Sequence, residues 1–175
     1  MAICSALSAG IAKSCDTNTG GILKLYIADF ENVSSYTEVS GEITAITMAG
    51  GSKFYEFQFN RNTSSYEETI NVDLTNGTTF FEQRATLVLA RREKTKREAI
   101  KKLTAGQKQL AIIMKDSNNL YWFLGLTDGA ILQEMAGGSG VQKSDANNYT
   151  LTFVAQEPSP MPEVDDAIIA AIITI

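Results

Sequence analysis

The side chains that most often carry out acid–base and metal chemistry are scarce in this sequence. The chain has no histidine, and its two cysteines are Cys4 and Cys15. Histidine is the commonest general base and a member of the usual serine and cysteine triads, and it occurs in most zinc sites. These sites are therefore excluded, and carboxylates and thiols are the remaining groups that could act on a substrate.

Two pairs of adjacent acids, Glu67-Glu68 and Asp165-Asp166, are the candidates for a glycosidase-type carboxylate pair. Neighbouring residues on a strand point to opposite faces of its sheet. Glu67 and Glu68 therefore cannot share one substrate on a strand. We expect no enzymatic activity from these acids, and no cofactor or metal bound by the chain.

A glycine-rich stretch at residues 137–144, GGSGVQKS, has the composition of a phosphate-binding loop. Such a loop requires glycine immediately before its lysine, and Gln142 occupies that position. The flanking sequence predicts strands, whereas phosphate is held at the N-terminus of a helix. The stretch therefore predicts a solvated hairpin loop.

Aromatic residues gather in the segment LYWFLGL, where Tyr121, Trp122 and Phe123 are consecutive. Tyr121 and Trp122 could form a platform on which a sugar ring stacks. The same residues in an apolar strand are more often part of a core. A carbohydrate-binding β-sandwich module therefore stays open as an alternative function.

The most concentrated charge lies in residues 91–102, RREKTKREAIKK, which we call the basic segment. It holds seven of the fifteen Lys and Arg residues but two of the twenty acids, so it carries +5 while the rest of the chain carries −10. Such segregation predicts an acidic partner: nucleic acid, an anionic surface or another copy of this chain. No interleaved aromatic residues accompany the segment, which disfavours a grip on nucleic acid.

The elements that must position these residues are mostly strands. Period-2 alternation and apolar runs predict strands near residues 22–29, 42–48, 53–60, 66–74, 79–90, 109–116, 120–126, 130–135 and 148–157. One helix is predicted over residues 92–105, ended by Gly106 and apolar only at Ala99, Ile100 and Leu103. The fold class is mainly β: an antiparallel sandwich or barrel with this helix inserted between strands.

The strands on either side of the helix predict two meanders. Residues 53–74 form a hairpin in our interpretation, with Tyr55, Phe57 and Phe59 on one face of its first strand. On its second strand, we expect the mainly apolar alternate residues to face inward: Tyr66, Glu68, Ile70, Val72 and Leu74. Asn76-Gly77 is the strongest hairpin signal, and it joins the second strand to residues 79–90. The strands at residues 109–135 form the second meander.

Length and composition bound the remaining possibilities. The 175 residues, 44% of them hydrophobic, predict one domain at residues 1–175, with an N-terminal arm at 1–20 and a C-terminal tail at 158–175. Three prolines break the start of the tail, and its β-branched end predicts a strand. No apolar run is long enough to span a bilayer, so we expect no membrane contact. Whether Cys4 and Cys15 form a disulfide stays open.

A predicted strand, helix and strand follow one another in the segments TLVLA, RREKTKREAIKKLTAG and QLAIIMKD. This order resembles that of the tail tube proteins of bacteriophages, whose fold is shared with the tubes of type VI secretion and contractile injection systems. The opening SAGIAKSCDTNTGGI is similar to the N-termini of tail proteins in phages of Bacteroidetes hosts. The resemblance covers most of the chain as an architectural pattern.

This resemblance implies a structural virion protein that forms hexameric rings stacked into a conduit for DNA. Its partners would be copies of itself, other tail proteins, and DNA in transit through the lumen. The implied lumen-lining residues are the polar faces of the predicted hairpin: Glu56, Gln58, Asn60, Glu67, Thr69, Asn71 and Asp73. A tail terminator or a head-to-tail connector would satisfy the same pattern.

The resemblance also places the helix outside the lumen sheet, where it can meet acidic copies of the chain. The implied inter-subunit residues are the seven cations of the basic segment: Arg91, Arg92, Lys94, Lys96, Arg97, Lys101 and Lys102. We expect the arm and the tail to lie on neighbouring subunits.

Overall fold

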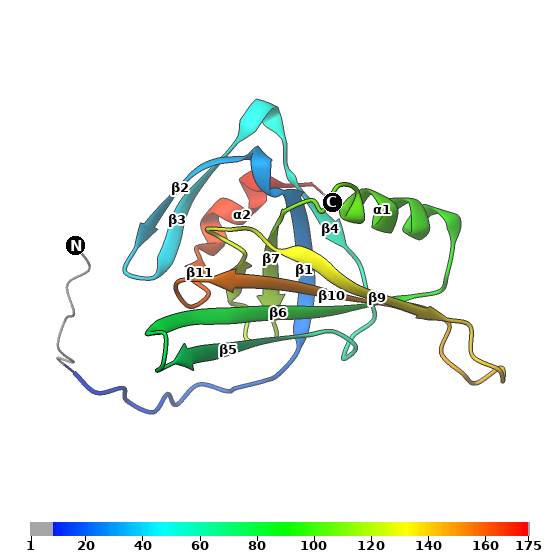
Figure 1. Cartoon of the computed structure of the whole chain (residues 1–175), viewed down its shortest axis with the longest axis horizontal. Helices are drawn as coiled ribbons and strands as arrows, with labels where there is room; N and C mark the ends of the chain where they lie inside the picture. The colour runs from blue at the N-terminus through cyan, green and yellow to red at the C-terminus, as the bar shows by residue number, and fades with distance from the viewer. Residues whose placement is uncertain (1–8, 175) are drawn as a thin grey trace.

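The computed structural model describes residues 9–174, and its strands form two sheets (Figure 1). The first sheet has eight strands in the order β12 (Ile173–Thr174), β4 (Phe54–Phe57), β1 (Ile22–Asp29), β7 (Leu110–Asp116), β8 (Tyr121–Leu124), β11 (Glu163–Val164), β3 (Glu42–Met48) and β2 (Val33–Val39). The second has four, in the order β5 (Ser65–Asp73), β6 (Thr78–Ala90), β10 (Asn148–Glu157) and β9 (Ile131–Gly138).

Two α-helices accompany the sheets. Helix α1 (Lys94–Thr104) is inserted between β6 and β7, and α2 (Asp166–Ile172) precedes the last strand. Two short 3-10 turns, Phe30–Asn32 and Ala49–Gly51, connect strands of the larger sheet. The predicted mainly β architecture, with a helix between strands, is confirmed, and α2 is an addition to it.

The two sheets face one another across the first of two cores. Leu25 and Ile112 of the larger sheet meet Leu87 and Phe153 of the smaller sheet, all fully buried. Ile100 of α1 packs against the same core, and only the last turns of the helix reach it. The four-stranded sheet therefore has one covered face, which also carries α1.

The second core lies on the other side of the eight-stranded sheet. Strand β1 serves both cores, because Leu25 points to the first and Tyr26 to the second, as expected for a strand buried on both faces. Helix α2 closes the second core with Ile169 and Ile172, against Phe123 of β8.

The strand predicted for the C-terminal tail is wrong over most of its length, because α2 occupies it. Asp165 caps the helix by accepting a hydrogen bond from the N–H of Ala167 at 2.9 Å. Ile169 and Ile172 are three residues apart and both buried. The cap and the burial of this helical stripe outweigh the β propensity of isoleucine. The tail thus packs on its own subunit, where β12 pairs with β4.

The predicted hairpin over residues 53–74 is also wrong. Strand β4 pairs with β1 in the larger sheet, whereas β5 pairs with β6 in the smaller sheet. The polar stretch between β4 and β5 carries the chain from one sheet to the other. On the predicted apolar face, Phe57 and Phe59 pack against the first core, whereas Tyr55 is 59% exposed; Phe54 is fully buried on the opposite face, in the second core.

Two further strands differ from their predictions. Strand β9 leaves the predicted second meander and pairs with β10, so the chain again changes sheets after β8. Residues 33–39, expected to be a loop, form the edge strand β2. Ser and Glu are frequent there because this strand is largely exposed.

A buried polar contact ties the two sheets and the tail together. Gln83 of β6 is 1% exposed, and its side-chain oxygen accepts from the N–H of Gly125 at 3.2 Å. Its amide nitrogen donates to Glu68 and to the carbonyl of Ser159, each at 3.3 Å. Glu68 also accepts from the N–H of Met161 at 2.7 Å. These hydrogen bonds set the position of the four-stranded sheet against the larger one.

Candidate assembly surfaces

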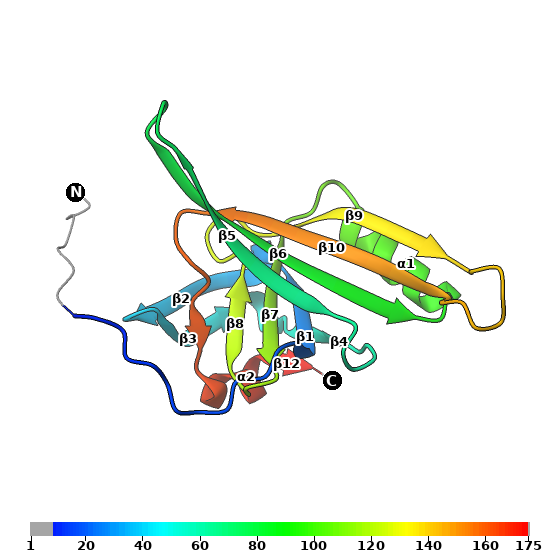
Figure 2. The ribbon, with the colours of Figure 1, turned by 90° about the horizontal axis from the view of Figure 1, so that it is seen from below.

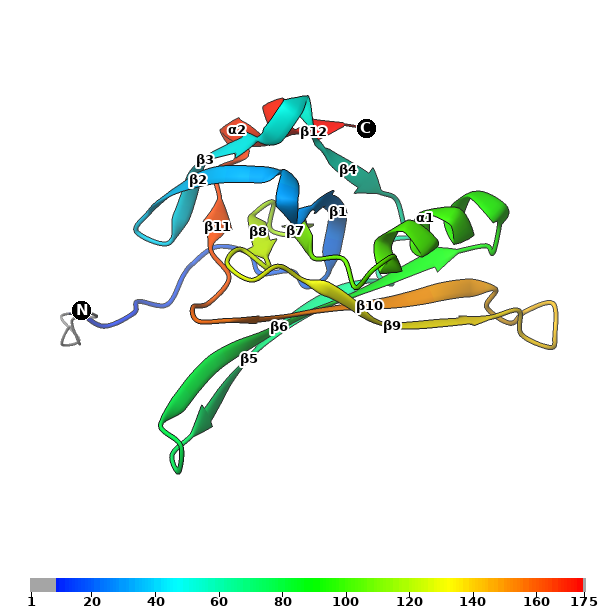
Figure 3. The same ribbon diagram turned by 45° about the horizontal axis from the view of Figure 1, so that its top comes forward.

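One face of the four-stranded sheet is uncovered and carries many polar side chains. Figure 3 shows α1 and the larger sheet on one side of this sheet, and within residues 9–174 no element covers the other side. We call that side the outer face. Register places on it the polar residues Glu67, Thr69, Asn71, Asp73, Glu82, Arg84, Thr86, Glu134, Thr150, Thr152 and Gln156, together with the apolar residues Phe80, Val88, Ile131 and Val154.

The outer face is acidic, although it contains one arginine. Arg84 lies 3.4 Å from Glu67 on β5 and 2.9 Å from Glu82 on its own strand. Asp73 and Glu134 add two further carboxylates. Four carboxylates and one guanidinium give the face a charge of −3 per subunit.

Four of the seven predicted lumen residues lie on this face and three do not. Glu67, Thr69, Asn71 and Asp73 share the exposed side of β5. Glu56 instead lies in the larger sheet, 3.8 Å from Lys24 of β1, and its side chain is 10% exposed. Gln58 and Asn60 follow the end of β4, in the connection between the sheets. The two predicted groups therefore do not share a face.

Sequence reasoning missed the outer-face residues of the other three strands. Thr86 and Thr152 lie opposite one another on β6 and β10, with Glu134 next to them on β9. Alternation along β6 and β10, where the even-numbered residues face outward, was the signal that could have found them. The sequence does not indicate that β10 pairs with β6, because the paired residues Ala90 and Asn148 are 58 positions apart in the chain.

The β5–β6 hairpin extends beyond the body of the molecule, and its tip is held by an aspartate (Figure 2). Asp73 accepts from the side-chain amide of Asn76 at 2.6 Å and from the N–H groups of Thr75 and Asn76 at 2.8 and 3.2 Å. These hydrogen bonds hold the pKa of the Asp73 carboxyl below its ordinary value. The bond from the Asn76 side chain has the largest effect, and the two backbone donors add to it.

This turn should therefore resist acid. A depressed pKa means that the charged form stabilises the folded turn above the ordinary aspartate pKa of about 3.9, and that this contribution is lost as the pH falls through the lower folded value. NMR titration of the Asp73 carboxyl carbon is expected to give a midpoint below that of an aspartate in an unstructured peptide. A midpoint at or above that of the peptide would contradict the assigned hydrogen bonds.

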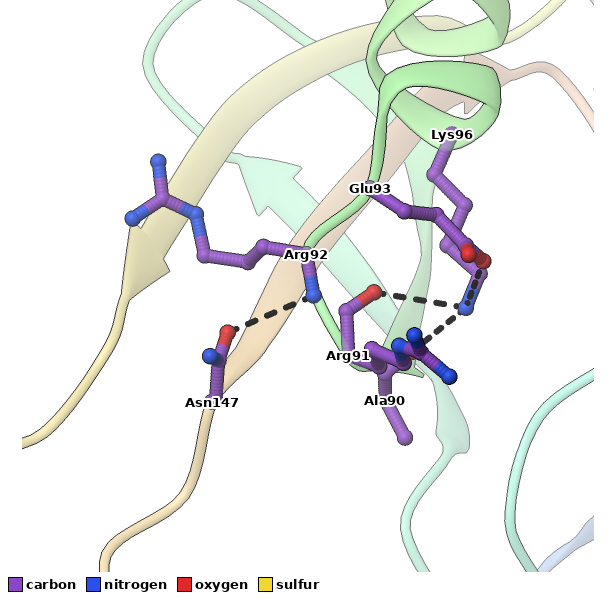
Figure 4. Close-up of polar contacts among 6 residues, drawn as sticks. All are labelled: Ala90, Arg91, Arg92, Glu93, Lys96 and Asn147. Atoms are coloured by element: carbon purple, nitrogen blue, oxygen red, sulfur yellow. Dashed lines mark hydrogen bonds and ion pairs between the residues drawn. The ribbon is translucent and has the colours of Figure 1, made fainter.

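The helix of the basic segment begins two residues later than predicted, at Lys94. Arg91 has a φ of 62°, which no α-helix accommodates, and its N–H donates to the carbonyl of Asn147 at 2.7 Å. Figure 4 shows the Lys96 ammonium against the carbonyls of Ala90 and Arg91, at 2.5 and 3.3 Å. Lys96 also lies 2.8 Å from Glu93. Lys96 therefore holds the turn between β6 and α1.

The other cations of the basic segment are available to a partner. Among the described residues, no carboxylate lies within 4.0 Å of Arg91, Arg92, Lys94, Arg97, Lys101 or Lys102. All six are exposed. Arg92 lies over the ring of Tyr149, 5.2 Å from its centroid. The helix thus presents an unneutralised positive surface on the covered side of the four-stranded sheet.

Tyr121 and Trp122 do not form a joint platform. Trp122 packs against the first core, and its ring N–H donates to the buried carboxylate of Asp116 at 3.2 Å. Tyr121 packs against the second core, on the other face of the sheet, with Lys115 5.1 Å above its ring. One sugar ring could not stack on both.

The remaining candidates from the sequence have structural roles. Glu67 and Glu68 point to opposite faces, as predicted, because Glu67 meets Arg84 outside and Glu68 meets Gln83 inside. Residues 139–147 join β9 to β10 as a hairpin loop, in which Asp145 accepts from two backbone N–H groups. Over residues 9–174, no group of three or more potential metal ligands is found.

The edges of the four-stranded sheet are β5 and β9. In the described part of the chain, no further strand pairs with the free edge of either one. Residues 9–17 of the N-terminal arm are exposed, and the arm meets the body near Thr19, which donates to Asn118 at 2.8 Å. Cys15 is exposed, whereas Cys4 lies outside the described residues, so the disulfide stays untested. No described helix is long and apolar enough to cross a membrane.

No protein-family model matches this chain, and no curated protein matches it. Its function must therefore be inferred from the surfaces that the fold presents.

Proposed function

We propose that this chain is a structural subunit of a phage-type tail tube, in which rings of subunits stack around a channel for DNA. The supporting observation is the contrast between the two sides of the four-stranded sheet. One side is a bare, polar face with a charge of −3, and the other carries the core and the basic helix. In the tube, the outer face lines the lumen of the virion's tail.

An acidic, threonine-rich wall suits a channel for DNA. Phosphates bind proteins through Lys and Arg, and the single Arg84 on this face is already engaged by Glu67 and Glu82. Repulsion between the wall and the DNA backbone keeps the DNA from sticking during transit. Glu67, Thr69, Asn71 and Asp73 stay lumen candidates, joined by Glu82, Thr86, Glu134, Thr150 and Thr152.

The open edges supply the contact within a ring. An unpaired strand edge exposes N–H and C=O groups that readily pair with another chain. Pairing of β5 of one subunit with β9 of the next would continue the sheet around the channel, and such a head-to-tail contact closes into a ring at a suitable rotation. The aggregation hazard of each edge is thereby removed.

Size-exclusion chromatography with light scattering, followed by negative-stain microscopy, tests this proposal. The purified protein is expected to form rings or tubes. A stable 19.0 kDa monomer at all concentrations would contradict it. Rings that never stack would instead indicate a tail terminator or connector, and glycan binding by a monomer would indicate the carbohydrate-binding alternative.

A further inference from the structure

The projecting end of the β5–β6 hairpin carries apolar side chains that nothing covers in the described structure. Ile70 and Val72 are 54% and 55% exposed, and Leu74 at the tip is 91% exposed. Ile70 and Val72 lie on the same face of β5 as Tyr66, which packs against the first core. The apolar stripe of the core thus continues past the body of the protein, as a docking surface would.

The same hairpin is acidic. Between Glu67 and Glu82 the chain contains no Lys or Arg, and its charged residues are Glu67, Glu68, Asp73 and Glu82. Asp73 is ionised at neutral pH, as an exposed aspartate is. A partner for the tip should therefore combine cations with an apolar patch.

Such a surface exists on this chain, beside α1. Two adjoining hollows of about 440 and 520 Å³ are both lined by Arg92, Arg97, Glu98 and Tyr149. The larger also reaches Lys101 and, on β9, Met135, which is 48% exposed, so cations outnumber the acid in it. We call this surface the α1 groove. The Tyr149 hydroxyl is buried, and it has no hydrogen-bond partner within the described structure. A polar group from outside would satisfy it.

The β5–β6 hairpin tip and the start of α1 are at opposite ends of the four-stranded sheet in Figures 1, 2 and 3, and residues at the start of α1 line the α1 groove. One molecule therefore cannot join its own tip to its own groove. We propose that the hairpin tip of one copy docks in the α1 groove of a second copy, with Ile70, Val72 and Leu74 on the apolar floor and the Asp73 carboxylate, the acid at the tip, against Arg92 and Arg97.

The tip-to-groove contact joins copies end to end, in the direction of the strands. Pairing of β5 with β9 joins copies side by side, perpendicular to the strands. The two contacts therefore do not compete, and the tip contact joins one ring to the next. The inference rests on the proposed function in this respect, since it names the contact by which rings stack.

Two variants remove one half of the contact each. The tip variant is Ile70→Ser, Val72→Ser and Leu74→Ser, and the groove variant is Arg97→Glu with Met135→Glu. All five side chains are exposed, so both variants are expected to fold, with a circular dichroism spectrum and a melting temperature close to wild type. Each alone is expected to stop at particles that do not stack.

Mixing the variants then tests the head-to-tail geometry. The groove variant retains an intact tip and the tip variant retains an intact groove, so one productive contact is possible per pair. Light scattering is expected to show particles of twice the mass that either variant forms alone, and no longer stacks. A matched control, Val39→Ser with Leu120→Ser, alters exposed apolar residues in and next to the larger sheet, away from the tip, the groove and strand β9, and should stack normally.

The outcomes separate this inference from the proposed function. Wild-type tubes together with normal stacking of either variant would overturn the docking contact and leave the tube standing. Unstacked variants that give no doubled mass on mixing would also overturn it. A wild type that never forms rings, combined with mass doubling in the mixture, would contradict the tube but support the docking contact.

Discussion

Replacement of Lys94, Arg97, Lys101 and Lys102 with glutamate is expected to leave the subunit folded but to prevent its assembly into tubes. All four side chains are exposed, and they lack a carboxylate partner among the described residues. Each reversal changes the charge by −2, so four change the net charge of the chain from −5 to −13. The helix would then repel the acidic surfaces of other copies instead of attracting them.

The set omits Lys96, because its ammonium holds the carbonyls of Ala90 and Arg91. Its reversal would disturb the turn before α1 and confuse loss of folding with loss of assembly. A matched control replaces Lys13, Arg61 and Lys143 with glutamate and adds Gln58→Glu and Gln133→Glu, all exposed outside the basic segment, which gives the same net charge; it spares Lys53, whose ammonium donates to the carbonyl of Ala171.

Sedimentation velocity at low salt measures the effect, because screening weakens contacts between exposed charges. The helix variant should sediment as smaller particles that have not joined into tubes, and the control should form tubes. Normal tube length and stability of the helix variant at low salt would count against the basic segment as an inter-subunit surface. Equal loss in both variants would show that net charge alone governs assembly.

Replacement of Gln83 with leucine is expected to destabilise the fold by about 2–4 kcal/mol, because a buried N–H loses its partner and further hydrogen bonds disappear. Gly125, whose N–H donates to Gln83, is itself buried, so water cannot readily replace the lost acceptor. Glu68 and the Ser159 carbonyl lose their donor as well. The lost hydrogen bonds are those that join the two sheets, so the variant should weaken the packing of one sheet on the other.

Urea unfolding followed by circular dichroism measures this free energy, with Gln156→Leu as the control. Gln156 lies on the neighbouring strand β10 and is exposed, so the same chemical change should cost less than about 0.5 kcal/mol there. Equal free energies of unfolding for the two variants would mean that the Gln83 contacts contribute nothing to stability.

Local patterns predicted most of the strands but not their partners. Residues 22–29, 42–48 and 148–157 form strands at the predicted positions, since apolar runs and turn residues are local signals. Strand pairing depends on contacts far apart in sequence. Alternation therefore could not reveal that β4 joins β1, or that β9 joins β10.

The same limit explains which surface residues could be identified. Glu67 and Thr69 share the outer face because alternation along one strand determines their side. Glu56 was grouped with them through a hairpin that does not form. The six unpaired cations of the basic segment could be found from composition, whereas the role of Lys96 depends on the left-handed turn at Arg91.

A cryo-electron microscopy reconstruction of the assembled wild-type protein would show which surface of the subunit faces the channel. We expect a hollow tube in which Glu134, Thr150 and Thr152 of the outer face line the channel and α1 lies on the opposite side of the sheet. An assembly with α1 facing the channel, or with the outer face buried between copies, would contradict it.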